Sequence, residues 1–158
     1  MSIDVGSPAP SFTLETPEGG VSLSDFVGKT LVLYFYPKDD TPGCTTEALQ
    51  FTALGEAFAA AGATVVGVSR DSVASHRRFA EKHKLGVRLA SDPAGQTIEA
   101  YGAWVEKSMY GRKYMGIDRS TFLVGPDGKV TAIWRKVKVP GHAETVLHAA
   151  QRLGQGLP

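Results

Sequence analysis

The chain has 158 residues, with 17 Lys and Arg against 16 Asp and Glu, a formal net charge of +1 and a single cysteine. This length suits one domain over residues 1–158, large enough to bury a core without disulfides or a metal ion. One cysteine excludes an internal disulfide framework and any zinc site built from several thiolates. The near-zero net charge argues against broad electrostatic binding of nucleic acid or of a membrane surface.

The apolar runs are far shorter than the roughly 20 residues that a membrane span needs. The first residues show neither the basic segment nor the apolar segment of a secretory signal. We therefore expect a soluble, cytoplasmic protein.

The first half of the chain alternates between strand and helix patterns. Residues 12–14 and 21–23 flank a turn that contains Pro and Gly, which predicts an N-terminal hairpin. Residues 30–36 form a continuous apolar, aromatic and β-branched run, typical of a strand buried on both faces. A long helix is expected from about 42 to 61, and a second buried strand at 64–69.

The middle of the chain begins with a predicted helix at 72–83. A short strand is expected at 89–91 and a short helix at 96–101. Residues 102–116 are rich in aromatic residues and glycine, and we expect this stretch to be irregular, with its aromatic rings packed against the sheet.

The last third predicts a hairpin of strands at 119–124 and 130–134, followed by an amphipathic helix at about 143–153. This order of elements predicts an α/β fold, a mixed central sheet flanked by helices. In such folds the carboxyl end of the first long strand is a common place for a site, and Cys44 lies there.

Cys44 is expected in the first turn of the helix that follows the central strand. Thr41 is a suitable N-cap residue, and Pro42 suits the first helical position. The sulfur would lie close to free backbone N–H groups and to the positive end of the helix dipole, which favour a thiolate. Nearby carboxylates oppose this effect, namely Asp39, Asp40 and Glu47. A reactive thiolate here therefore requires a cation close by.

Helical spacing also predicts that the thiol faces inward. One apolar stripe with a single carboxylate joins Cys44, Glu47, Phe51, Leu54 and Phe58. A lone cysteine is usually a small buried hydrophobe, but the strand, the cap, the proline and the glycine around this one favour a functional thiol. A phosphatase loop would need an arginine at Gln50, and a dithiol redox motif would need a cysteine at Glu47.

Pro37, Thr41 and Cys44 match the Pro-x-x-x-Thr-x-x-Cys signature of peroxiredoxins, and Arg119 resembles the distal arginine of that family. Closer still is the resemblance to the bacterioferritin-comigratory, or Q-type, subfamily, carried by Tyr36-Pro37-Lys38, by Thr41-Pro42-Gly43-Cys44-Thr45 and by the opening Gly6-Ser7-Pro8-Ala9-Pro10-Ser11-Phe12. It extends over most of the chain, from about residue 6 to residue 153.

The resemblance implies a thioredoxin-like fold and a thiol peroxidase that uses neither a cofactor nor a metal. Cys44 would be the peroxidatic cysteine, whose thiolate attacks a peroxide oxygen and becomes a sulfenic acid. Thr41 would hold the peroxide, and Pro37 would shield the thiolate from water. Arg119 would stabilise the thiolate and the departing oxygen, with Glu47 as the residue that orients it.

Many Q-type members carry a resolving cysteine five residues after the peroxidatic one, or in the next helix. Leu49 occupies the first of these positions, and no residue from 72 to 83 is a cysteine. We therefore expect an external thiol to reduce the sulfenic acid. Thioredoxin is the usual donor of the family, with glutaredoxin or glutathione as alternatives. The expected substrates are hydrogen peroxide and organic hydroperoxides, and the expected state is a monomer or a weak homodimer.

Two other interpretations stay open at this stage. One is a non-catalytic thioredoxin-fold module with a binding or chaperone-like role. The other is a cysteine hydrolase, which would need a histidine base such as His142 beside Cys44. His76 and His83 share a predicted helix face, and for both we expect a surface or packing role rather than a metal site.

Overall fold

The computed structural model describes residues 3–156, which are organised around a seven-stranded sheet with the order β2-β1-β5-β4-β3-β8-β9. Its strands are β1 (Thr13–Thr16), β2 (Gly19–Ser22), β3 (Thr30–Phe35), β4 (Ala63–Ser69), β5 (Arg88–Ser91), β8 (Ser120–Val124) and β9 (Val130–Trp134). The neighbours β3, β4 and β5 are parallel and the other pairs are antiparallel. The predicted mixed sheet and the N-terminal hairpin of β1 and β2 are thus confirmed.

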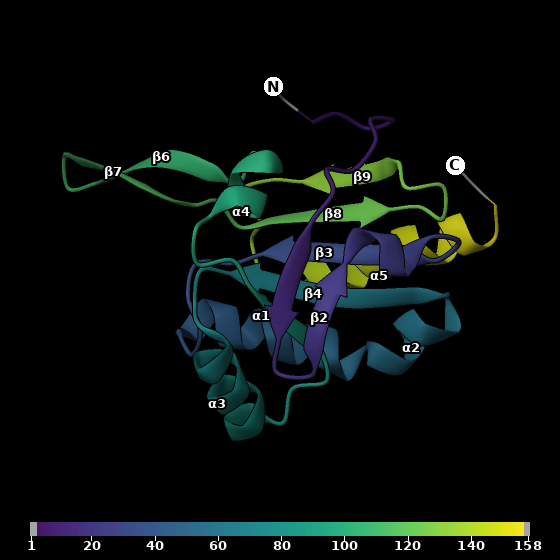
Figure 1. The fold of residues 1–158 in the computed structure, drawn as a ribbon, viewed down its shortest axis with the longest axis horizontal. Coiled ribbons are helices and arrows are strands. Elements are labelled where there is room, and N and C mark those ends of the chain that lie inside the picture. Colours follow the sequence, from purple (N-terminus) through teal and green to yellow (C-terminus); the bar gives the residue numbers. More distant parts are fainter. Residues whose placement is uncertain (1–2, 157–158) are drawn as a thin grey trace.

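Helices cover both faces of this sheet (Figure 1). They are α1 (Pro42–Ala53), α2 (Gly55–Ala60), α3 (Val73–His83), α4 (Gln96–Ala100) and α5 (His142–Gly154), with a 3-10 turn η1 (Leu23–Phe26). Side chains of α1, α2, α3 and α5 belong to one hydrophobic cluster, and those of α4 and η1 belong to the other. No helix in the described part of the chain is long and apolar enough to cross a membrane.

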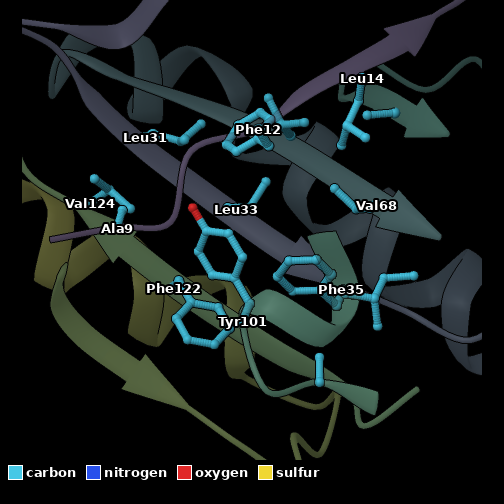
Figure 2. Packing of buried hydrophobic residues seen from close by; sticks show 14 of the residues in the cluster. Ala9, Phe12, Leu14, Leu31, Leu33, Phe35, Val68, Tyr101, Phe122 and Val124 are labelled. Atoms are coloured by element: carbon cyan, nitrogen blue, oxygen red, sulfur yellow. The ribbon is translucent and has the colours of Figure 1, made fainter. Parts of the chain in front are cut away.

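Strand β3 is buried along its whole length because it supplies both clusters. Leu31, Leu33 and Phe35 point into the cluster shown in Figure 2, while Val32 and Tyr34 point towards α1 and α5. The period of two along a strand divides this uniformly apolar run between the two faces. The carboxyl end of β3 leads directly into the loop that carries the candidate site.

Residues 102–116 are not irregular, so that expectation is wrong. They form a hairpin of β6 (Trp104–Met109) and β7 (Arg112–Ile117), a separate two-stranded sheet that projects from the molecule (Figure 1). Tyr110 and Gly111 close it with positive φ values of 52° and 79°, as two-residue hairpin turns require. Tyr110 and Tyr114 are 98% and 44% exposed, so they do not pack against the main sheet. Most side chains on both faces of this hairpin are exposed, so its sequence lacks the polar-apolar alternation from which a strand is predicted.

The helix predicted from 42 to 61 is also divided in two. It ends at Ala53, and α2 starts at Gly55, with Leu54 between them at φ −98° and ψ 9°. Glycine is a weak helix former, so the chain can turn at this point. Leu54 and Phe58 still contribute to the cluster around Cys44, so the inward stripe is confirmed.

Candidate active site

The loop between β3 and α1 places Cys44 at the carboxyl end of the central strand. Thr41 is the N-cap residue of α1 with extended backbone, and its carbonyl accepts the first helical hydrogen bond from Thr45 N–H at 2.8 Å. The N–H groups of Gly43 and Cys44 precede this bond and have no acceptor within the helix. Cys44 itself is only 2% exposed. The thiol therefore lies in a protein-lined site next to two unused backbone donors.

Thr41 caps the helix with its backbone only. Its hydroxyl donates to the carbonyl of Lys38 at 2.8 Å and makes no hydrogen bond to the helix N–H groups, contrary to the usual capping role. This bond holds the hydroxyl within the loop that also carries Pro37, whose side chain is exposed.

Arg119 supplies the cation that the sequence analysis required. It lies between β7 and β8, and its carbonyl accepts a hydrogen bond from Val137 N–H at 2.9 Å. Its Nη2 donates to Cys44 Sγ at 3.3 Å, and its Nη1 donates to Glu47 Oε1 at 2.6 Å. A Cβ on Gly43 would lie 3.3 Å from Nη2, so the glycine leaves room for the guanidinium.

Glu47 and Arg119 form a buried ion pair one helical turn from the thiol. The Glu47 side chain is 1% exposed, and burial raises the pKa of its carboxyl to about 7, although Arg119 acts to lower it. Burial lowers the pKa of the Arg119 guanidinium, but the nearby Glu47 and Cys44 raise it by more. The pKa of Arg119 is therefore above its ordinary value. The guanidinium of Arg119 therefore stays positively charged, and Glu47 holds it next to Sγ. Glu47 Oε2 is buried and has no hydrogen-bond partner in the described structure.

The two other carboxylates near Cys44 are held by helix α3. Asp39 accepts hydrogen bonds from side chains of its own loop and of α3, namely Tyr36, Ser75 and His76. Asp40 pairs at the surface with Lys82 and His83. Both carboxylates thus have partners of their own. His76 has no exposed surface, so of the two roles expected for it packing is the one observed.

His142, the histidine base that a cysteine hydrolase would need, is buried near the site. Its Nε2 lies 2.8 Å from Thr121 Oγ1, and its ring packs edge-on against Phe51. Burial, helped by the charge of Arg119, lowers the pKa of His142 to about 4, so the imidazole is neutral at pH 7. The hydrogen bond of Cys44 is with Arg119, and the geometry gives no support to a cysteine hydrolase.

Tyr34 of β3 is buried in the hydrophobic cluster that also contains Cys44, as its place in the predicted buried strand indicates. Its ring stacks on Phe51 with centroids 4.8 Å apart, and its buried hydroxyl has no hydrogen-bond partner in the described structure. Burial, with smaller contributions from Glu47 and Cys44, raises the pKa of Tyr34 well above its ordinary value. A Cβ on Gly67 would lie 2.6 Å from Tyr34 Cζ, so a glycine inside β4 was the sequence signal for this close approach.

No group of three or more His, Cys, Asp or Glu side chains within residues 3–156 is arranged to hold a metal ion.

The chain is similar to known proteins over most of its length. Residues 5–133 match the model of the AhpC/TSA family. The chain belongs to this family, as a peroxiredoxin of the Bcp or peroxiredoxin Q type. It is 45% identical to peroxiredoxin Bcp of Bacillus subtilis over 156 residues, 98% of this chain and 99% of the relative. It is 50% identical to peroxiredoxin Bcp of Xanthomonas campestris over 145 residues, 90% of this chain and 91% of the relative.

A solved structure extends the likeness to the fold. The bacterioferritin comigratory protein of Xanthomonas campestris, studied for its alkyl peroxide reduction activity, matches with a TM-score of 0.88 and 45% identity. The match covers 96% of this peroxiredoxin and 98% of that chain. The thioredoxin-like fold is thereby confirmed, with its mixed sheet flanked by helices.

Proposed function

We propose that this peroxiredoxin reduces hydrogen peroxide and organic hydroperoxides through a sulfenic acid on Cys44, which an external thiol then reduces. The observation that carries the proposal is the guanidinium of Arg119, held 3.3 Å from Cys44 Sγ by the buried Glu47. The alkyl peroxide activity of the Xanthomonas campestris relative supports organic hydroperoxides as substrates. The domain acts as one unit over residues 1–158, in the cytoplasm, as a monomer or a weak homodimer.

In the oxidative step the Cys44 thiolate attacks the terminal oxygen of the hydroperoxide. The O–O bond breaks, the sulfur becomes a sulfenic acid, and the departing alkoxide takes a proton and leaves as the alcohol, or as water from hydrogen peroxide. Arg119 stabilises the thiolate and the negative charge on the departing oxygen. Thr41 Oγ1 and the N–H groups of Gly43 and Cys44 hold the peroxide, while Pro37 shields the thiolate from water.

In the reductive step an external thiol attacks the sulfenic sulfur. Water leaves, and a mixed disulfide joins the reductant to Cys44. A second thiol of the reductant then releases the Cys44 thiol and carries away the disulfide. The support for this route is that the chain has no second cysteine. Thioredoxin is the first candidate reductant, with glutaredoxin and glutathione as alternatives.

Stopped-flow reaction of the reduced protein with one equivalent of hydrogen peroxide tests the oxidative step. We expect fast loss of the thiol and, after addition of a sulfenic-acid reagent, one adduct located on Cys44 by mass spectrometry. Cys44→Ser is the matched control and should consume no peroxide. A rate equal to that of a free thiol, or turnover by the serine variant, would contradict the proposal.

The reductive step is tested separately by steady-state turnover with a thioredoxin system, a glutaredoxin system or glutathione alone. Turnover with at least one of them is expected. A protein that forms the sulfenic acid but turns over with none of these thiols would overturn the external-thiol route while leaving the oxidative step intact.

A further inference from the structure

A buried polar network lies behind the loop that carries Pro37 and Thr41. Its centre is Asp39, which lies midway between these two residues and is only 7% exposed. Tyr36 Oη donates to Asp39 Oδ1 at 2.6 Å, and Ser75 Oγ donates to Asp39 Oδ2 at 2.8 Å. A carboxylate out of contact with water needs such donors to remain stable, so this residue is held in one orientation.

The third partner of Asp39 is His76 of α3, which has no exposed surface. Its Nδ1 lies 2.7 Å from Asp39 Oδ2, and its Nε2 lies 3.0 Å from the carbonyl oxygen of Ala90. A backbone carbonyl only accepts, so Nε2 carries a hydrogen. His76 therefore connects the loop to the end of β5 through two hydrogen bonds with opposite ring nitrogens.

The backbone of Asp39 is held as well as its side chain. Its N–H donates to Asp71 Oδ2 at 2.9 Å, and the same oxygen accepts from Ser69 Oγ at 2.7 Å. The next residue, Asp40, has a positive φ of 58°, a conformation that surrounding contacts must maintain. Two residues after Asp39 the chain reaches Thr41, whose hydroxyl is fixed on Lys38.

We propose that Asp39 and His76 are positioning residues for the peroxide reaction. They fix the loop against α3 and thereby place the Thr41 hydroxyl and Pro37 over Cys44. This inference rests on the proposed function, because it concerns how the peroxide is held. Neither residue contacts Cys44 through a hydrogen bond in the described structure, whereas Arg119 donates a hydrogen bond to the sulfur. Loss of the network should therefore impair the reaction with peroxide far more than the reactivity of the thiol itself.

Two amide substitutions at His76 separate positioning from packing. His76→Asn keeps a donor near the place of Nδ1, facing Asp39, whereas His76→Gln keeps a donor near the place of Nε2, facing Ala90. Both lose the ring, so both lose similar packing. For each variant the rate constant with hydrogen peroxide is compared with the rate constant for alkylation of Cys44 by iodoacetamide, a reaction that needs no peroxide site.

We expect His76→Gln to lower the peroxide rate constant by about 10²-fold, the scale of a misplacement of about 1 Å, with the alkylation rate within about threefold of wild type. His76→Asn should restore most of the peroxide rate. Tyr36→Phe, which removes one donor to Asp39 and keeps the ring, should give a smaller loss of about tenfold and serves if the histidine variants fail to fold. Lys113→Ala, which removes the exposed partner of Glu106 on the β6–β7 hairpin, is the control and should change neither rate.

Equal losses of the two rates in His76→Gln, or equal peroxide rates in the Asn and Gln variants, would overturn the inference. An unchanged peroxide rate in Tyr36→Phe would also contradict it. Failure of the proposed function is distinguishable, because the wild-type protein would then react with peroxide no faster than a free thiol.

Discussion

Glu47 offers a direct test of the electrostatics of the site, through the substitution Glu47→Gln. The carboxyl is 1% exposed, one of its oxygens binds Arg119, and the other has no hydrogen-bond partner in the described structure. Glutamine keeps an acceptor for Arg119 and removes the ionisable group. The variant therefore isolates the cost of ionising a buried carboxyl at this position.

The magnitude follows from the pKa of Glu47, which burial raises from an ordinary 4.5 to about 7. At pH values between these two, the folded protein holds a proton that the unfolded chain has lost. The stabilisation from this proton is fully present below about pH 4.5 and is lost as the pH rises through about 7. With about 1.4 kcal/mol per pKa unit, the wild-type protein loses about 2–3 kcal/mol from this group between pH 5 and pH 8.

Urea unfolding at several pH values from 5 to 8 measures this effect. The unfolding free energy of Glu47→Gln minus that of wild type should rise by about 2–3 kcal/mol across the range. The matched control is Glu56→Gln, which removes an exposed carboxyl on α2. A difference for Glu47→Gln that stays flat within about 0.5 kcal/mol, or one that falls with pH, would refute the reasoning.

Three further predictions concern Arg119, the contact of Tyr34 with β4, and helix α1. Arg119→Lys keeps the charge but cannot hold Glu47 and Cys44 together, and stopped-flow kinetics should show a peroxide rate constant lower by about 10²-fold or more; an unchanged rate would exclude the electrostatic role. Gly67→Ala places a Cβ 2.6 Å from the Tyr34 ring and should lower the urea-unfolding free energy by about 1–3 kcal/mol, and wild-type stability would show that this contact is not tight. In Leu49→Cys, α1 must unwind before a disulfide forms, because residues five apart on a helix are too distant to be bridged. Rapid quenching should therefore trap the sulfenic acid first, and a disulfide that appears as fast as the thiol is lost would contradict this.

Much of the fold could be predicted because its signals are local. The uniformly apolar run that became β3 and the turn residues of the β8–β9 hairpin each identify their element from a few neighbouring side chains. The β6–β7 hairpin was missed because most of its side chains face solvent, so no buried face imposes a period of two. The break at Leu54 was missed because one glycine after a strong helical pattern is a weak signal.

The sequence by itself determined where the only thiol of the chain lies. A buried strand, an N-cap residue and a proline fix Cys44 in the first turn of α1, and helical spacing turns it inward beside Glu47. These features depend on residues within about two helical turns of each other. The carboxylates near Cys44 in the sequence also indicated that a thiolate there needs a cation close by. They did not indicate how that cation would be oriented.

Only the tertiary structure decided how the charges around Cys44 are arranged. Arg119 is 75 residues from Cys44 and reaches it because β8 pairs with β3, and Asp39 meets His76 because α3 packs behind the loop. Whether a hydrogen bond or an ion pair forms depends on differences of a few tenths of an ångström in the separation of two atoms, and here those atoms are remote in sequence. The same carboxylates that oppose a thiolate in the sequence are therefore, in the folded protein, the groups that hold the arginine and the loop in place.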